Sequence, residues 1–150
     1  MEIKQQSAFT ALAFSVQTNF EGIFKFVRIK AAELHKDAVA NNLEITGPVY
    51  WIYTGMDGQP NTVFTLDIVI PVTPPASYQG SFEIKKVLPF KCISSVMNGS
   101  WENLPATYGQ LFTEAGKNNY THNGVCREVY IHMDFDTPAN NITEVQVGIV

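Results

Sequence analysis

The feature of this sequence that most constrains its fold is an order of strand and helix segments that occurs twice. Each series has a strand, a helix and then two strands, and turn residues such as Gly47-Pro48 and Asn98-Gly99 separate the segments. The first series is a strand at 9–18, a helix from about 19 to 40, and strands at 49–54 and 63–72. The second is a strand at 82–96 broken at Leu88-Pro89, a helix at about 104–115, and strands at 125–133 and 142–150.

Apolar spacing predicts both helices. Thr18 and Glu21 form a capping-box pattern, so we expect the first helix to begin near Asn19 and to end at Asn41. Its apolar stripe of about five turns comprises Phe20, Ile23, Phe24, Val27, Ala31, Leu34 and Ala38. The second stripe comprises Leu104, Tyr108, Leu111, Phe112 and Ala115, with Pro105 in the first turn and Gly116 at the end.

A constant offset relates the two series. The segment Gly47–Tyr53 aligns without gaps on Gly124–Tyr130, 77 positions later, and this alignment makes Trp51 the counterpart of Glu128. We therefore predict an α+β fold with a duplicated strand–helix–strand–strand repeat, in which one antiparallel sheet carries two helices on one face. The chain is expected to be a single domain, 1–150, with repeats at about 8–72 and 81–150 and a ligand cleft between them.

Charge and hydropathy exclude several classes of function. The net charge of −4 leaves no electrostatic footprint for nucleic acid. The basic residues Lys25, Arg28, Lys30 and Lys36 are spread through one helical pattern, which is typical of a solvated helix face. No run approaches the ~20 apolar residues of a membrane span, and no signal peptide is recognisable, so we expect a cytoplasmic protein without membrane contact. Cys92 and Cys126 are expected to be buried free thiols.

Strand alternation gathers the residues that could bind a ligand. Glu128 and Tyr130 share one side of their strand, and Trp51 and Tyr53 share one side of theirs. A cleft lined by these four would suit an aromatic or cationic ligand, through stacking, cation–π contact and one countercharge. The alternative is that Glu128 is a surface residue paired with Lys or Arg.

Two further aromatic residues are candidates for the same cleft. Trp101 follows the turn at Gly99 and could form either a cleft wall or a hydrophobic staple for the second helix. Tyr108 belongs to the helical stripe and is a core residue by default, but its hydroxyl could reach the cleft. The three histidines have no ligand spacing, and no nucleophile elbow or phosphate loop occurs, so no metal, cofactor or catalytic residue is predicted.

The order of several short motifs resembles the GyrI-like, or effector-binding, domain family. In the second half these motifs are Leu88–Ile93, Gly99–Leu104, Pro105–Leu111 and Glu128–Tyr130. In the first half Phe64–Val72 is similar to the strand that closes that family's first repeat. The resemblance implies small-molecule binding in a cleft between two repeats, as in the sensor domains of AraC- and MerR-type regulators. It also implies that Glu128 pairs with cationic ligands.

The resemblance leaves three functions open. The first is a standalone binding domain for a hydrophobic or cationic small molecule, lined by Glu128 and its aromatic neighbours. The second is a hydrolase of cyclopropane-bearing electrophiles that uses Glu128. The third is a protein that acts in trans on a regulator or on gyrase. Met97 stands where many members have His, and Trp101 where Tyr is common, which removes two proton-transfer groups and favours binding.

Overall fold

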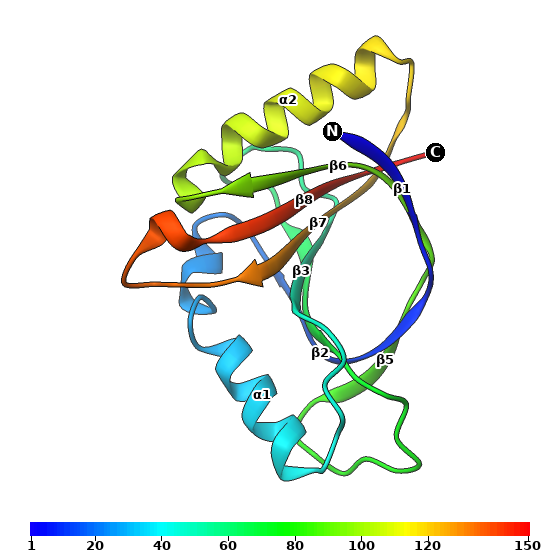
Figure 1. Cartoon of the computed structure of the whole chain (residues 1–150), viewed down its shortest axis with the longest axis vertical. Helices are drawn as coiled ribbons and strands as arrows, with labels where there is room; N and C mark the ends of the chain where they lie inside the picture. Colours follow the sequence, from blue (N-terminus) through cyan, green and yellow to red (C-terminus); the bar gives the residue numbers. More distant parts are fainter.

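The computed structural model describes residues 1–150 as one eight-stranded antiparallel sheet with two α-helices (Figure 1). The strands are β1 Glu2–Gln6, β2 Phe9–Thr18, β3 Val49–Thr54, β4 Phe64–Pro71, β5 Glu83–Val87, β6 Phe90–Asn98, β7 His122–His132 and β8 Ile142–Ile149. The helices are α1 Lys30–Ala40 and α2 Leu104–Lys117, and the short 3₁₀ helices are η1 Gly22–Lys25, η2 Trp101–Asn103 and η3 Pro138–Asn140. The α+β class expected from the sequence is confirmed.

The sheet has the same order of elements on both sides of its centre. Its strands lie in the order β1-β6-β8-β7-β3-β4-β2-β5, with β3 and β7 paired in the middle. The offset of 77 holds inside the helices as well, because the buried residues Leu34 and Ala38 of α1 correspond to Leu111 and Ala115 of α2. In the central ladder the counterparts Trp51 and Glu128 are direct cross-strand partners. They therefore lie where the two halves meet.

Both helices cover the same face of the sheet, which they share with the largest hydrophobic cluster. Leu34 and Leu111 belong to one cluster with Trp51 and the inward residues of β4 and β8. The opposite face has a smaller cluster, which comprises Ala11, Ala13, Tyr50, Ile52, Val69, Val87 and Val129. Neither helix is long and apolar enough to cross a membrane.

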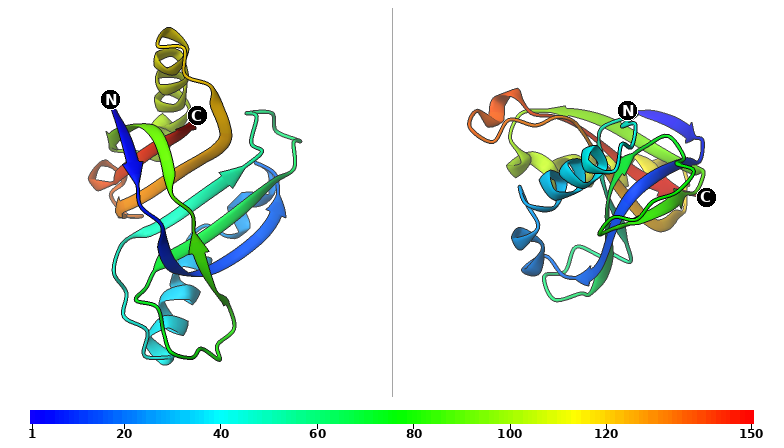
Figure 2. Two further views of the ribbon diagram at one scale, coloured as in Figure 1. Left: turned by 90° about the vertical axis from the view of Figure 1, so that its right-hand side faces the viewer. Right: turned by 90° about the horizontal axis from the view of Figure 1, so that it is seen from below.

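The edges of the sheet are joined by a long crossing ribbon. Gln6 pairs with Phe90 and Phe9 pairs with Val87, so β1–β2 and β5–β6 form one antiparallel register that is interrupted at residues 7–8 and 88–89. Figure 2 shows these segments curving over the face opposite the helices. The predicted strand 82–96 is thus two strands in opposite halves of the sheet: β5 forms one edge, and β6 lies between β1 and β8 near the other. Strand β1 escaped prediction because the polar run Glu2–Gln6 has no apolar alternation.

The predicted first helix is wrong over its first half. Instead of one helix from Asn19, η1 covers only Gly22–Lys25, and α1 begins at Lys30. The Asn19 side chain, rather than the expected capping box, accepts a hydrogen bond from the Gly22 N–H at 2.9 Å. Arg28 has φ 67°, a left-handed conformation that interrupts any continuous helix. The apolar residues before it pack at the border of the core cluster and also line a cavity.

Candidate functional site

A large apolar cavity lies on the helix-covered face of the central strands. Its volume is about 1230 Å³, and 17 of its 24 lining residues are hydrophobic. Small-molecule pockets commonly measure ~300–1000 Å³, so this space admits a sizeable ligand. The segment before α1, the inner sides of α1 and α2, β3, β7 and the loops after them supply the walls.

Glu128 is a buried carboxylate within this apolar lining. It is 4% exposed, and the alternation of β7 directs it to the helix-covered side, next to Trp51 of β3. Its two oxygens accept hydrogen bonds from three tyrosine hydroxyls: Oε1 from Tyr108 at 2.8 Å, and Oε2 from Tyr53 at 3.3 Å and from Tyr130. A carboxylate offers about four acceptor positions, which leaves capacity for one further donor.

No positive side chain compensates the charge of Glu128. The ion pairs of the protein involve Lys4, Lys30 and Lys85, and none of them reaches Glu128. Burial raises the pKa of Glu128, although the three tyrosine hydrogen bonds oppose this effect. Burial, together with the Glu128 charge, raises the pKa of Tyr53, Tyr108 and Tyr130 well above their usual value, so their hydroxyls stay protonated donors.

Aromatic rings continue from Glu128 along one wall of the cavity. The Tyr130 ring makes edge contacts with Trp51 at 6.2 Å and with Trp101 at 5.6 Å between ring centroids. Trp101 in turn contacts Phe135 at 5.3 Å, and its indole N–H donates to Thr143 Oγ1 at 2.9 Å. Since that N–H is already used, Trp101 presents its ring and no free polar group to the cavity.

The structure brings all six predicted site residues to the lining of this cavity. They are Glu128, Trp51, Tyr53, Tyr130, Trp101 and Tyr108. The alternative of a surface Glu128 paired with Lys or Arg is excluded by its burial and hydrogen bonds. Trp51 and Glu128 lie side by side on the cavity floor, because they are cross-strand partners, and do not face each other across the space.

Several lining residues were not predicted from the sequence. They include Arg28, His35, Asp57 and Phe135. Arg28 was interpreted as part of a solvated helix face; it is exposed, but it lies outside α1 and borders the cavity. Phe135 lies in the turn after β7. The only sequence signal for its place in the cavity was that a large aromatic residue occurs in a turn.

The cysteines are both free and buried, as expected from the sequence. Cys126 lies two residues before Glu128 on the same side of β7, where burial raises the pKa of its thiol to about 12. A thiol with this pKa stays protonated near neutral pH and is a poor nucleophile. Cys126 therefore contributes packing beside the carboxylate.

The whole chain matches the model of one protein family. The profile of the GyrI-like small molecule binding domain matches residues 1–150. The chain belongs to this family. A search of curated proteins finds no match.

Solved structures share the GyrI-like fold at low sequence identity. The C-terminal domain of EcmrR has a TM-score of 0.76 at 18% identity, covering 99% of this chain and 96% of that one. The EcmrR chain in a DNA complex has a TM-score of 0.80 at 17% identity. The match covers 99% of this chain but only 56% of the EcmrR chain. SAV2435 bound to tetraphenylphosphonium has a TM-score of 0.69 at 11% identity, covering 99% of this chain and 93% of that one.

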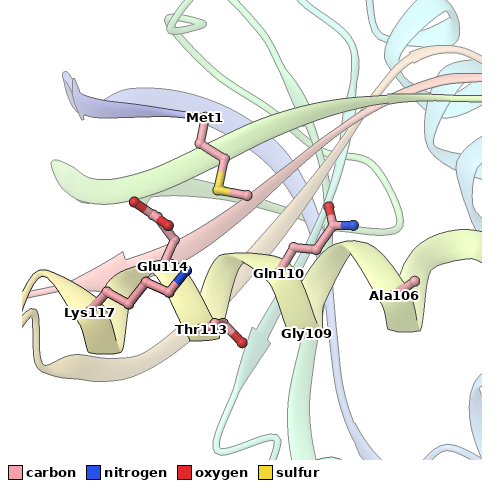
Figure 3. Close-up of a pocket in the computed structure, with 7 residues that line it drawn as sticks. All are labelled: Met1, Ala106, Gly109, Gln110, Thr113, Glu114 and Lys117. Carbon is pink, nitrogen blue, oxygen red and sulfur yellow. The ribbon is translucent and has the colours of Figure 1, made fainter.

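A second hollow of this GyrI-like chain lies on the outer side of α2 (Figure 3). It measures about 450 Å³, and Gln110, Thr113, Glu114 and Lys117 line it beneath Met1. These side chains are polar and largely solvated, and no buried titratable group is among them. The large cavity, with its buried carboxylate, is therefore the candidate site.

Proposed function

We propose that this GyrI-like domain binds aromatic, lipophilic organic cations in the large cavity, with Glu128 as the acceptor of their charge. The observation that carries the proposal is a buried carboxylate without a countercharge, held by three tyrosine hydroxyls in an apolar cavity. Burying such a charge is unfavourable unless a partner compensates it. A ligand cation supplies that partner, and its desolvation inside the cavity strengthens the attraction.

The aromatic lining favours the same class of ligand. The faces of Trp51, Tyr130 and Trp101 attract a cation through their quadrupoles, by roughly 0.5–2 kcal/mol for each favourable contact. The hydrophobic lining adds the burial of the ligand's own apolar surface. SAV2435, which shares the fold, binds tetraphenylphosphonium, and this cation is a suitable first probe.

Isothermal titration with tetraphenylphosphonium tests the proposal. We expect binding to the wild-type protein, and an affinity at least tenfold lower for Glu128→Gln, a loss of ~1.4 kcal/mol. Triphenylphosphine oxide, an uncharged analogue, should bind the two proteins equally. Glu114→Gln is the matched control, because it removes a carboxylate from α2 outside the cavity. Equal affinity of tetraphenylphosphonium for wild type and Glu128→Gln would contradict the role of Glu128.

The raised pKa of Glu128 supports a second candidate, a hydrolase of cyclopropane-bearing electrophiles. A buried carboxyl group with a raised pKa suits general acid–base catalysis near neutral pH. In this scheme Glu128 takes a proton from a water whose oxygen bonds to a cyclopropane carbon, and the ring C–C bond that breaks passes its electron pair to the electron-accepting group conjugated with the ring. Mass spectrometry of a cyclopropane-bearing alkylator with wild type and Glu128→Gln separates the candidates: conversion by wild type alone supports hydrolysis, and no conversion supports binding.

Residues 1–150 are proposed to act as one binding unit, built from repeats at about 8–72 and 81–150. An action in trans on a regulator or on gyrase, and a cytoplasmic location, remain predictions from the sequence.

A further inference from the structure

Arg28 is an unpaired cation at the edge of the ligand cavity. Its guanidinium carbon lies 4.3 Å from the centroid of the Phe135 ring, and both residues line the cavity. The Arg28 side chain is exposed, no carboxylate lies within ion-pair distance of it, and it makes no side-chain hydrogen bond to the protein. All five guanidinium N–H donors are therefore free.

The backbone places Arg28 in this position at a conformational cost. Its φ of 67° is disfavoured for residues with a side chain, and Asn42 and Asn119, which share it, are of a type that tolerates it. Strained residues of this kind persist where the surrounding structure requires them, and they concentrate at ligand sites. Here the left-handed residue lies between η1 and α1, and the Arg28 guanidinium stacks on the Phe135 ring.

An unbroken series of aromatic contacts connects Arg28 with Glu128. Phe135 contacts Trp101 at 5.3 Å, and Trp101 contacts Tyr130 at 5.6 Å. The Tyr130 hydroxyl donates to Glu128. The wall is thus aromatic along its length, with the guanidinium of Arg28 stacked on Phe135 at one end and the Glu128 carboxylate at the other.

We propose that Arg28 is a second anchor of the cavity, so that the preferred ligand is an aromatic zwitterion. Its cationic centre lies at Glu128, and its carboxylate accepts hydrogen bonds from the guanidinium of Arg28. The planar guanidinium matches a carboxylate with two parallel hydrogen bonds, which a lysine ammonium does not reproduce. The inference rests on the proposed binding of cations at Glu128 and adds a requirement at the other end of the wall.

The ordinary role of such a residue is that of a solvated arginine that covers an exposed ring. That role requires neither a left-handed backbone nor a position in the lining of a cavity. It also predicts no selectivity between ligands, which makes the two roles separable by experiment.

Two dyes that differ in one group test the proposal. Rhodamine B carries a free carboxylate and is a zwitterion, whereas its ethyl ester is a monocation with the same aromatic frame. Fluorescence polarisation gives the affinity of each dye for wild type, Arg28→Asn, Arg28→Lys and Lys25→Gln. Asn tolerates the left-handed conformation, so Arg28→Asn removes the charge with little change of backbone. Lys25→Gln removes a nearby positive charge that does not line the cavity.

We expect wild type to bind rhodamine B about tenfold more tightly than the ester, by ~1.4 kcal/mol. Arg28→Asn should abolish this preference and leave the ester affinity within about twofold, Arg28→Lys should keep part of it, and Lys25→Gln all of it. The proposal is overturned if wild type shows no preference, if Arg28→Asn lowers the affinity for both dyes equally, or if Lys25→Gln has the same effect as Arg28→Asn.

The two proposals fail in different ways. If neither dye binds wild type, the binding function itself fails. If the ester binds with dependence on Glu128 but Arg28 adds nothing to the affinity for rhodamine B, only this inference fails.

Discussion

Arg127 and Glu128 are neighbours in β7, are both charged and are both 4% exposed, yet they lie on opposite faces of the sheet. Arg127 is packed: its guanidinium lies 3.8 Å from the Phe90 ring centroid and donates to the Leu88 carbonyl at 3.2 Å. Glu128 has three hydroxyl donors but borders about 1230 Å³ of apolar space. Burial of a charge alone therefore does not indicate a ligand site. Adjacent space that a partner could fill distinguishes Glu128 from Arg127.

The largest expected effect is on the packed side of this comparison. Arg127→Ala removes the stack on Phe90 and leaves the Leu88 carbonyl without its donor, at the point where the edge ribbon crosses. We expect the free energy of unfolding in urea to fall by about 3 kcal/mol. The affinity of the folded variant for tetraphenylphosphonium should stay within about twofold of wild type. A large loss of affinity with unchanged stability would contradict the assignment of stability to the Arg127 face and of ligand binding to the Glu128 face.

Substitution of Glu128 should raise the stability of the free protein, whereas substitution of Arg127 lowers it. Since its pKa is raised in the folded state, folding favours the protonated form, and this contribution is lost as pH rises through the folded pKa. We therefore expect Glu128→Gln to be more stable than the free wild-type protein near pH 7, and the gain to vanish below the ordinary glutamate pKa of about 4.3. Thermal unfolding across pH measures this, and a Gln variant that is less stable at pH 7 would show that the carboxylate is a structural requirement.

The smallest effect concerns a single hydroxyl. Tyr108→Phe removes the donor to Glu128 Oε1, so the ionised carboxylate loses one of its three supports. We expect the affinity for tetraphenylphosphonium to fall by about fivefold, near 1 kcal/mol. Tyr120→Phe is the matched control, since Tyr120 packs against the core outside the cavity. Equal effects of the two substitutions would assign Tyr108 to packing alone.

Much of the fold was predictable because the regular segments have clear periods. The strands at 9–18 and 49–54 agree with β2 and β3 residue by residue, since alternating or continuous apolar residues mark them. The break in the first helix was not predictable, because Phe20–Val27 retains helical spacing. Those side chains line a cavity, and apolar lining has the same sequence pattern as a packed stripe.

The site was predictable in composition but not in geometry. The offset of 77 and strand alternation brought Trp51 and Glu128 together. Strand alternation also placed Tyr53 and Tyr130 on that side, whereas the approach of the Tyr108 hydroxyl to Glu128 depends on how α2 packs across the sheet, which no local pattern encodes. Arg28 and Phe135 meet across 107 residues of chain for the same reason.

The most direct test is the titration of the Glu128 carboxyl group by ¹³C NMR, with and without saturating tetraphenylphosphonium. In the free protein its pKa should lie above the ordinary glutamate value of about 4.3, because burial disfavours the charge. Bound cation favours the ionised form, so the account predicts that the pKa falls on binding and that affinity rises with pH through this range. A bound complex in which the pKa of Glu128 is unchanged would contradict the claim that this carboxylate receives the charge of the ligand.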